Sequence, residues 1–295
     1  MKLLSKPYWH RKYIKCLEKS GSEKLVWEQT KELYYSVTGK WLDYNCPKDL
    51  NQKLMWLTRY DQNPLKTRCA DKYLVREYLK EKGLDELIVP LLGVWNDPND
   101  IDFDNLPDQF VLKCNHGSGY NIICLDKSSL DVERTREMLR IWMSEDYSEK
   151  LFELHYKAVP RKIIAESLLS ETAPIEYQFW CLNGEPESIL VCRKNFDGTY
   201  DAGSFSLQWE RLFDRKNEDK SVSFPRPSMG VEVLAEYARK LSSSFSFVRT
   251  DFYVVDEKVY LAELTFTPSA NLLVKYKQSF LDRLGSKLIL PKKSI

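Results

Sequence analysis

The chain has 295 residues, of which 43% are hydrophobic and 29% are charged, as in ordinary globular proteins rather than disordered ones. Its formal net charge of +1 excludes the broad basic field that nucleic-acid-binding proteins present. No stretch approaches the roughly 18 consecutive apolar residues of a membrane span. We therefore expect no nucleic-acid partner and no membrane span, and the length is sufficient for more than one lobe.

Cysteine usage and the N-terminus indicate the compartment. The 7 cysteines are scattered along the chain, and no Cys-x-x-Cys pair occurs among them. This pattern argues against a disulfide framework or a zinc site and favours reduced thiols. The apolar run near the N-terminus is only Leu3-Leu4, which is too short for a signal peptide. The sequence therefore predicts a cytoplasmic protein.

The N-terminal part of the chain, residues 1–85, has a helical pattern. In Glu23–Val37 and Asn51–Arg59, leucine, tryptophan and tyrosine recur at spacings of three and four residues, as on a buried helix face. The stretch Asp71–Lys82 is amphipathic, and the following Gly83 is a typical helix C-cap. We expect a helical region ahead of the main fold.

A hairpin with a glycine-rich tip is the clearest signal in the next part. The segment Leu87–Trp95 is strand-like but broken. After a polar connection, two β-rich runs, Phe110–Lys113 and Asn121–Cys124, flank the loop Asn115–Gly119. The pattern predicts two antiparallel strands joined by this loop.

More strands are expected in the second half of the chain. A helix over Ser129–Ser144 and a strand over Arg161–Leu169 come first. Two further strands, Tyr177–Leu182 and Glu187–Val191, are joined by the turn Asn183–Pro186. Strands and helices are therefore mixed within each part of the chain, as in an α+β protein.

A second hairpin follows near the C-terminus. The charged stretch Trp209–Ser221 is expected to be a loop, and Gly230–Ser242 a helix. Phe247–Val255 and Lys258–Leu264 then form a hairpin that turns at Asp256-Glu257. The end of the chain is predicted to be helical and basic.

Lys113 and the loop after it are a candidate phosphate site. Glycines lack a Cβ, so backbone N–H groups in the loop can approach a phosphate closely, and a strand lysine supplies a point charge. The motif is not a Walker A loop, because the chain returns into a strand rather than a helix. A plain hairpin with a Gly-Ser-Gly tip is the alternative.

The second hairpin carries a candidate metal site. Asp251 and Glu263 lie on adjacent strands, where two carboxylates can converge on a hard cation such as Mg²⁺. Arg249 alternates with Asp251, so both face the same side, and it could stabilise an oxyanion or a transferring phosphoryl group. A surface network of salt bridges is the alternative.

Three smaller sets of residues are also candidates. Lys72 and Arg76, four residues apart on one helix face, could bind a phosphate or a carboxylate. Glu166 and Glu176 flank a short connection and could accept hydrogen bonds from an adenine amino group and a ribose. The basic pair Arg193-Lys194 follows a strand and could clamp an anion. Solvated surface positions are the alternative for the basic residues.

Two common site types find no support. The chain has 3 histidines and no G-x-S-x-G elbow, which argues against a nucleophilic triad. No G-x-G-x-x-G run follows a strand, which argues against a Rossmann site.

The order of these pieces resembles the ATP-grasp superfamily: a lysine strand, a glycine-rich hairpin, a hinge glutamate and a hairpin with paired acids. More closely, the chain resembles the TupA-like ATP-grasp proteins, which are named for teichuronopeptide biosynthesis and found with surface-polysaccharide genes. The resemblance covers residues 51–268, and its specific parts are FVLK-x-NHGSG-x-N at 110–121 and ELTFTP at 263–268.

The resemblance implies an ATP-grasp fold, with two α+β lobes that sandwich ATP behind a helical N-terminal region. Residues 1–106 would form the helical region, and 107–170 the small ATP-binding lobe with its lid hairpin. Residues 171–295 would form the large C-terminal lobe with the metal site. ATP and Mg²⁺ are the implied cofactors.

The resemblance also implies roles for individual residues. The residues that would contact ATP are Lys72, Lys113, His116, Gly117, Ser118, Gly119, Glu166, Leu168 and Glu176. The two lysines would hold the phosphates, and the loop from His116 to Gly119 would cover them as a mobile lid. Glu166 and the backbone near Leu168 would take adenine. Glu176 matches a ribose-binding position that is usually aspartate in this family.

On the opposite lobe, Asp251 and Glu263 would ligate magnesium, and Arg249 would stabilise the oxyanion of a tetrahedral intermediate. Thr265 stands where the superfamily has asparagine, which weakens the case for a full third metal ligand. Pro268-Ser269 replaces the usual Pro-Gly. The residues expected to face the substrate are Arg193, Lys194, Ser269 and Asn271.

By this resemblance, the chain would be an ATP-dependent carboxylate–amine ligase that forms an amide through an acylphosphate. The carboxylate would be a uronic acid in a surface-polysaccharide precursor, or an amino acid. Three alternatives stay open: a glycosyltransferase of the same pathways, a kinase that phosphorylates a hydroxyl, and a non-catalytic nucleotide-binding or scaffold protein. The sequence does not indicate the oligomeric state.

Overall fold

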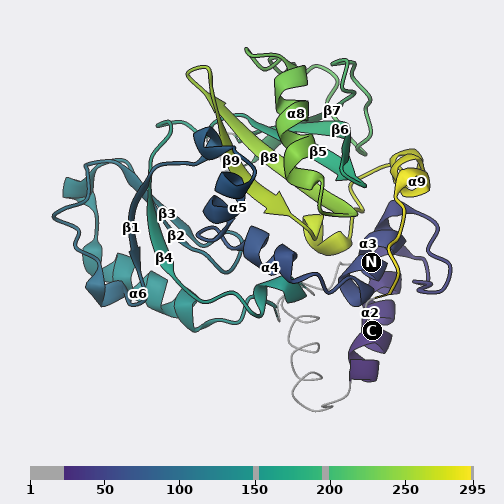
Figure 1. Ribbon diagram of the computed structural model, residues 1–295, viewed down its shortest axis with the longest axis horizontal. Helices are drawn as coiled ribbons and strands as arrows, with labels where there is room; N and C mark the ends of the chain where they lie inside the picture. Colours follow the sequence, from purple (N-terminus) through teal and green to yellow (C-terminus); the bar gives the residue numbers. More distant parts are fainter. Residues whose placement is uncertain (1–22, 149–152, 195–198, 294–295) are drawn as a thin grey trace.

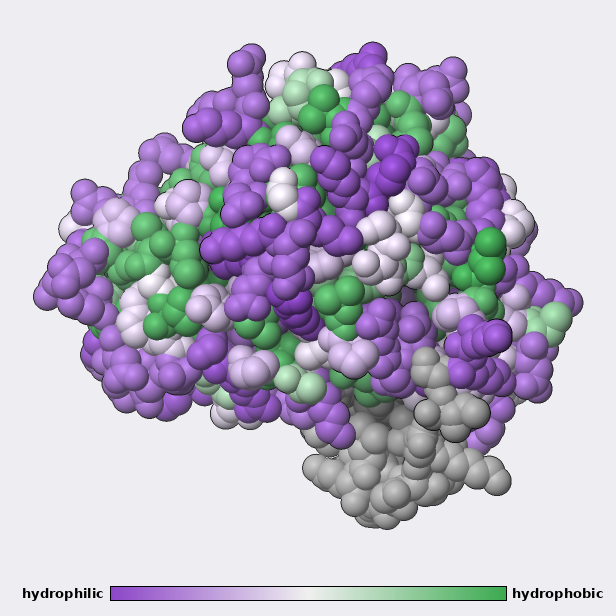
Figure 2. All heavy atoms as spheres, in the orientation of Figure 1, coloured by the Kyte–Doolittle hydropathy of each residue, from purple (hydrophilic) through white to green (hydrophobic). Residues whose placement is uncertain are grey.

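The computed structural model describes residues 23–148, 153–194 and 199–293 (Figure 1). Two separate antiparallel sheets organise the chain, one of four strands and one of five. Helices pack on both sheets, so the predicted α+β class is confirmed. Figure 2 shows a mostly hydrophilic face, with hydrophobic residues gathered over the smaller lobe at the left of the view.

The small sheet has the strand order β1-β4-β2-β3. Its strands are β1 (Leu91–Trp95), β2 (Phe110–Cys114), β3 (Asn121–Cys124) and β4 (Ile163–Ser167). The hairpin β2–β3 has the predicted position, with Lys113 opposite Asn121. The strand β1 pairs with β4 in this sheet, so the small lobe also uses a segment that precedes residue 107.

The two faces of the small sheet differ because residues alternate along β2. Phe110, Leu112 and Cys114 are buried against the helix α6 (Val132–Ser144) and the rest of the lobe core. Lys113 lies on the opposite face, next to β4. The helix α6 begins later than predicted, because the side chain of Asp131 caps it by accepting from the backbone N–H of Arg134 at 3.0 Å.

The large sheet has the strand order β7-β6-β5-β8-β9. Its strands are β5 (Glu176–Leu182), β6 (Glu185–Lys194), β7 (Tyr200–Phe205), β8 (Phe247–Val255) and β9 (Lys258–Thr265). The strand β7 was not predicted, and β6 extends through the basic pair at its end. The helix α8 (Val231–Ser242) covers one face, where Phe179, Val248 and Leu234 belong to a common core.

The opposite face of the large sheet is apolar at one end only. There Trp180 and Phe247 pack in a second core with helices from both ends of the chain. These helices are α2 (Glu23–Thr38), α3 (Leu50–Tyr60) and α9 (Gln278–Lys287). At the other end, the same face carries the polar residues of the candidate site, so these helices leave the functional end of the face uncovered.

The helix predicted over Asp71–Lys82 is shorter in the structure. Here α4 (Pro64–Ala70) and α5 (Val75–Glu81) are separate helices. Asp71 ends α4, and its carboxylate accepts from the backbone N–H groups of Tyr73 and Leu74, which holds a turn before α5. Gly83 has a φ of +65°, as expected for a glycine that follows a helix.

The described residues also include five short 3₁₀ segments: Asp85–Leu87, Pro98–Asp100, Lys127–Ser129, Leu154–Tyr156 and Pro268–Asn271. The predicted loop Trp209–Ser221 contains only isolated bridges. Within the described parts of the chain, no helix combines the length and apolar character that a membrane crossing requires.

Candidate functional site

A cavity of about 240 Å³ lies between the two sheets, and we name it the main cavity. Lys113 of the small sheet and Glu263 of the large sheet both line it, together with Lys72 from the turn before α5. Figure 1 shows α5 between the two sheets. The predicted residues on the cavity wall are Lys72, Arg76, Lys113, Glu166, Leu168, Lys194 and Glu263. The lysine strand and an acidic strand therefore face a shared space.

On the small-sheet wall, a buried carboxylate joins two cations. Glu166 is 5% exposed, and its oxygens accept from Arg76 and from Lys113, each at 2.5 Å. Arg76 also donates to the carbonyl of Val89 at 2.6 Å. Glu166 is thus held in ion pairs with both cations at the cavity wall. The trio retains an excess of positive charge toward the cavity.

Lys72 ties the glycine-rich loop to the cavity. Its ammonium donates to the carbonyl of Gly117, and its backbone N–H donates to the carbonyl of Asn115 at 3.4 Å. Burial lowers the pKa of Lys72, whereas nearby Glu263 acts in the opposite direction. Lys72 therefore connects the loop to the cavity, while none of the loop residues Asn115–Gly119 lines the cavity itself.

The loop glycines Gly117 and Gly119 have different structural roles. Gly119 has a φ of +80°, which favours glycine. A Cβ at Gly117 would meet the ring of Tyr147 at 2.6 Å, so this glycine permits close packing of the loop. His116 is buried, and its Nε2 lies 3.1 Å from the carbonyl oxygen of Trp142. Burial lowers the pKa of His116. His116 points into the lobe rather than toward the cavity.

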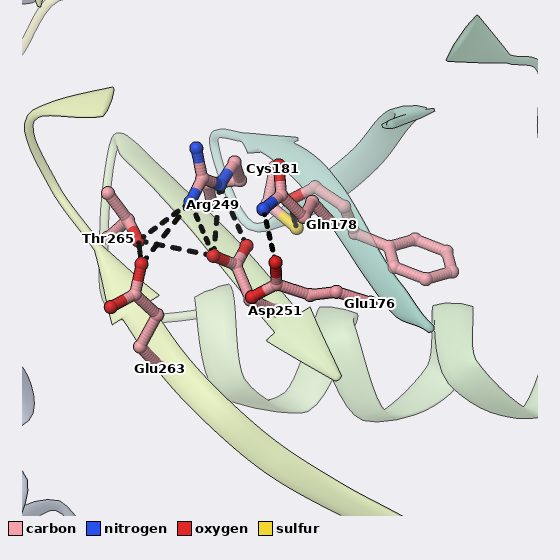
Figure 3. Close-up of polar contacts among 8 residues, drawn as sticks. Glu176, Gln178, Cys181, Arg249, Asp251, Glu263 and Thr265 are labelled. Atoms are coloured by element: carbon pink, nitrogen blue, oxygen red, sulfur yellow. Dashed lines mark hydrogen bonds and ion pairs between the residues drawn. The ribbon is translucent and has the colours of Figure 1, made fainter. Parts of the chain in front are cut away.

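The candidate metal residues cluster on β8 and β9 (Figure 3). Asp251 pairs with Glu263 across the strands, and Arg249 pairs with Thr265, so all four side chains share one face. Arg249 donates from Nε to Asp251 Oδ1 at 2.8 Å and from Nη2 to Glu263 Oε1 at 3.3 Å. Thr265 donates to the same Glu263 oxygen at 2.7 Å. The guanidinium therefore bridges the two carboxylates.

The carboxylates of Glu263 and Asp251 are not equally available to a hard cation. The Glu263 side chain is 36% exposed and lines the main cavity. Burial raises its pKa, but Arg249, Lys72 and Thr265 outweigh burial and lower it overall. Asp251 is 0% exposed, and burial raises its pKa despite the pairing with Arg249. Among the described residues, no group of three or more His, Cys, Asp or Glu side chains has a metal-binding arrangement.

The set fits a magnesium ion that takes most of its ligands from phosphates and water. Glu263 is the residue placed to hold such an ion at the cavity wall, and Thr265 supports its carboxylate. Asp251 could join only if its pairing with Arg249 rearranged. When bound, the ion would offset phosphate charge and act as a Lewis acid.

Glu176 lies on the same face of the sheet as the acidic cluster (Figure 3). It accepts a hydrogen bond from Gln178 at 2.9 Å, and Gln178 pairs with Asp251 across the strands. Burial raises the pKa of Glu176, and Glu263 raises it further. Glu176 is not on the wall of the main cavity.

The predicted substrate residues separate in the structure. Lys194 lines the main cavity, whereas Arg193 pairs with Asp201 at 3.0 Å. Asn271 is 2% exposed, and its amide donates to the backbone of Leu54 and to Thr58 at 2.8 Å. Asn271 thereby fastens the segment after β9 to α3 and does not reach the cavity. Ser269, beside it, has a φ of +51°.

Two polar residues near the site carried no sequence signal. Glu153 is 9% exposed and accepts a hydrogen bond from Thr267 at 2.6 Å. These residues are 114 positions apart in the chain, so neither periodicity nor a motif could pair them. Tyr156 and Tyr253, which line the main cavity, also looked like ordinary core aromatics in the sequence.

Two of the solved structures that this chain resembles are ligases. The L-amino acid ligase from Bacillus licheniformis is 14% identical, with a TM-score of 0.52 over 90% of this chain and 62% of that chain. The D-alanine–D-alanine ligase from Helicobacter pylori is 18% identical, with a TM-score of 0.42 over 77% of this chain and 60% of that chain. This chain thus spans about three fifths of each of those proteins.

At these identities, the likeness shows the fold alone, and the predicted ATP-grasp fold is confirmed. No curated protein shows significant similarity in sequence. The sequence model of the family described as TupA-like ATPgrasp matches residues 52–289, which is most of the chain. The chain therefore belongs to the TupA-like ATP-grasp family.

Proposed function

We propose that this protein is an ATP-dependent ligase that joins a carboxylate to an amine and forms an amide through an acylphosphate. One observation supports this proposal above all others: Lys72, Lys113 and Glu263, from distant parts of the chain, line the same cavity between two lobes. Cations on one wall and an acidic group on the other match a nucleotide whose phosphates face lysines on one side and a metal ion on the other.

The nucleotide would lie along the main cavity. Its adenine would rest on the apolar part of the wall, near Val89, Val111 and Leu168. Its phosphates would meet Lys72 and Lys113. A cavity of about 240 Å³ lies below the roughly 300–1,000 Å³ that is usual for such sites. We therefore infer that the tip of the β2–β3 hairpin moves to admit the nucleotide and then acts as a lid.

The same cavity would hold the carboxylate near the γ-phosphate. Transfer of the phosphoryl group to a carboxylate oxygen makes an acylphosphate and releases ADP. Attack by an amine then forms the amide and releases phosphate. Arg249 would stabilise the oxyanion of the tetrahedral intermediate while it keeps its pair with Asp251. Closure of the lid would exclude water, which would otherwise hydrolyse the acylphosphate.

For the carboxylate, we propose a uronic acid of a surface-polysaccharide precursor, or an amino acid. Lys194 on the cavity wall is a cation that such an anion could meet. Arg193, held by Asp201, would lie outside this contact.

Trapping of the acylphosphate tests this function. The protein would be incubated with ATP, Mg²⁺, hydroxylamine and one carboxylate at a time: glucuronate, galacturonate or a standard L-amino acid. Hydroxamate and ADP in equal amounts would support the ligase. A product phosphorylated on a hydroxyl group would show that the protein is a kinase instead. Turnover of a UDP-sugar without ATP would show that it is a glycosyltransferase. Each product has a distinct mass, so one set of spectra separates the outcomes.

A further inference from the structure

A group of cations lies on the large sheet next to the main cavity. Lys194, on the cavity wall, is the cross-strand partner of Tyr200, so the two side chains share one face of the sheet. The Tyr200 ring is 47% exposed, and its centroid lies 5.6 Å from the guanidinium carbon of Arg215 and 5.2 Å from Nζ of Lys275. Lys275 also donates to the Tyr200 hydroxyl at 2.9 Å. We name these four residues the cationic strip.

Backbone hydrogen bonds join the two segments that carry Arg215 and Lys275. Arg215 forms an isolated β-bridge with Tyr276. The backbone N–H of Lys216 donates to the carbonyl of Lys275 at 2.7 Å. The two cations of the outer strip are therefore held together by the fold, although they are 60 positions apart in the sequence.

The segment that leads to Lys275 has an unusual backbone. Ser269, Ala270 and Asn271 have φ angles of +51°, +52° and +57°, a region that residues other than glycine seldom adopt. The amide of Asn271 donates to Thr58 of α3 at 2.8 Å, which helps to hold this conformation. The strained stretch directs the chain from the acidic hairpin back to the strip, and strain of this kind is typical of functional sites.

Carboxylates near the strip are paired with other cations. Three such pairs are Asp201 with Arg193, Asp214 with Arg283, and Glu218 with Arg211. Glu218 also accepts from the backbone N–H of Arg215 at 3.3 Å, but not from its guanidinium. In the part of the chain that the structure describes, Lys194, Arg215 and Lys275 form no ion pair. An aromatic ring offsets only part of the repulsion between neighbouring cations, so the strip is suited to an anionic ligand.

The strip extends away from the reaction site. Burial raises the pKa of Tyr276, whereas Arg249 and Arg215 both lower it, so this ring lies near both guanidinium groups. Lys194 lines the main cavity, but Arg215 and Lys275 do not. A ligand confined to the cavity therefore does not reach the outer cations, whereas a longer anionic ligand does.

We propose that the cationic strip binds an oligouronide, with one carboxylate entering the main cavity past Lys194 and those of neighbouring sugars meeting Arg215 and Lys275. The proposal rests on the ligase function proposed above and selects the acidic glycan from the two carboxylate classes named there. Exposed ion pairs are individually weak, so affinity requires several of them at once. Rigid sugar rings hold their carboxylates at fixed spacings, which lowers the entropy lost on binding compared with a flexible acidic peptide.

The length dependence of binding tests the proposal without turnover. The parent would be titrated calorimetrically with galacturonate and with tetragalacturonate, in the presence of Mg²⁺ and a non-hydrolysable ATP analogue. We expect the tetramer to bind about tenfold more tightly than the monomer, and Arg215→Met/Lys275→Met to reduce this advantage to about twofold or less. The control Lys80→Met/Lys240→Met removes the same charge from exposed helix positions and should keep the advantage. Equal binding of both sugars by the parent would overturn the proposal, as would a full advantage in the strip variant.

Two further titrations identify the ligand chemistry. Raising KCl from about 50 mM to about 500 mM should remove most of the tetramer's advantage, because salt screens exposed charges. An advantage that persists at high salt would contradict recognition by the cations. Tetraglutamate carries the same repeated carboxylates on a peptide, and we expect it to bind more weakly than tetragalacturonate. Tighter binding of tetraglutamate would show that the strip takes an acidic peptide and would overturn the glycan assignment.

Hydroxamate formation separates failure of the strip from failure of the ligase function. With tetragalacturonate, Arg215→Met/Lys275→Met should raise KM about tenfold and change kcat at most about twofold, because the strip binds sugars that do not react. A fall in kcat with unchanged KM would contradict a binding role. If the parent forms no hydroxamate with any carboxylate, the ligase function fails, while the titrations still decide whether the strip binds an oligouronide.

Discussion

The two walls of the main cavity carry opposite charges, and each is partly neutralised from within. On the small sheet, Arg76 and Lys113 share the carboxylate of Glu166. On the large sheet, Asp251 and Glu263 share the guanidinium of Arg249. A single counter-ion lowers the cost of gathering like charges away from water. The small-sheet trio keeps one surplus positive charge and the large-sheet trio one surplus negative charge.

The walls differ in how firmly the counter-ion is held. Arg249 donates hydrogen bonds from two nitrogens to the fully buried Asp251, which fixes both side chains. On the other wall, Lys113 reaches Glu166 through one flexible ammonium group. The comparison indicates that Lys113 and Glu263 can exchange partners for a ligand. Asp251 and Arg249 serve first to hold the strands β8 and β9 in place.

The largest effect is expected from Glu263→Ala, because Glu263 is the open carboxylate of the acidic wall. Turnover of ATP should fall roughly 10³-fold, as for loss of a group that stabilises developing charge. Affinity for the nucleotide should change far less, because Lys72 and Lys113 remain. ADP release and calorimetric titration measure the two quantities. Glu257→Ala, on an exposed turn, is the control. Full turnover by Glu263→Ala would refute the metal assignment.

Arg249→Met tests whether the inner pair is structural. Loss of the guanidinium leaves Asp251 as a buried, unpaired carboxylate, so the free energy of unfolding should fall by about 3 kcal/mol or more. The double variant Arg249→Met/Asp251→Asn should recover part of this loss, because no charge remains unpaired. Urea denaturation measures both variants. An equal loss in the two would show that the packing of the arginine stem matters rather than the ion pair.

Lys113→Met tests the exchangeable cation on the opposite wall. A hydrogen bond to a charged group contributes about 2 kcal/mol, so ATP affinity should fall roughly 30-fold. Stability should change little, since Glu166 keeps its bond to Arg76. Titration with a non-hydrolysable ATP analogue, with Lys80→Met as the exposed control, gives the result. Unchanged affinity would remove Lys113 from the phosphate site.

The strands that carry Arg249, Asp251 and Lys113 could be predicted from the local sequence pattern. Strand alternation of two residues put Arg249 and Asp251 on one face, and the glycine-rich loop marked the hairpin that carries Lys113. The strand β7 escaped prediction because its sequence, YDAGSF, has small and polar residues and lacks a β-branched run. It adds to the sheet because its neighbour β6 offers an unpaired edge.

The pairings between distant segments could not be predicted in the same way. Arg76 meets Glu166 only because α5 packs beside the small sheet, and Glu153 meets Thr267 only because the lobes come together. No spacing rule joins such positions. Asn271 showed the opposite error, since a polar residue after the acidic hairpin suggested a substrate contact but instead satisfies backbone and hydroxyl groups of α3. The polarity of a residue alone does not show whether its side chain binds a ligand or forms buried hydrogen bonds within the protein.

The smallest effect, and the most discriminating, is expected from Glu166→Gln. The structure places this carboxylate between two cations, so a neutral amide should free Lys113 for phosphate and tighten ATP binding about threefold, or roughly 0.7 kcal/mol. Two partly buried cations then lose their counter-ion, so the melting temperature should fall at the same time. If Glu166 instead accepts a hydrogen bond from adenine, as the sequence suggested, the amide should weaken ATP binding. The direction of the change in ATP affinity therefore decides between the two roles. Tighter binding shows that Glu166 competes with phosphate for Lys113, and weaker binding shows that it accepts a hydrogen bond from adenine.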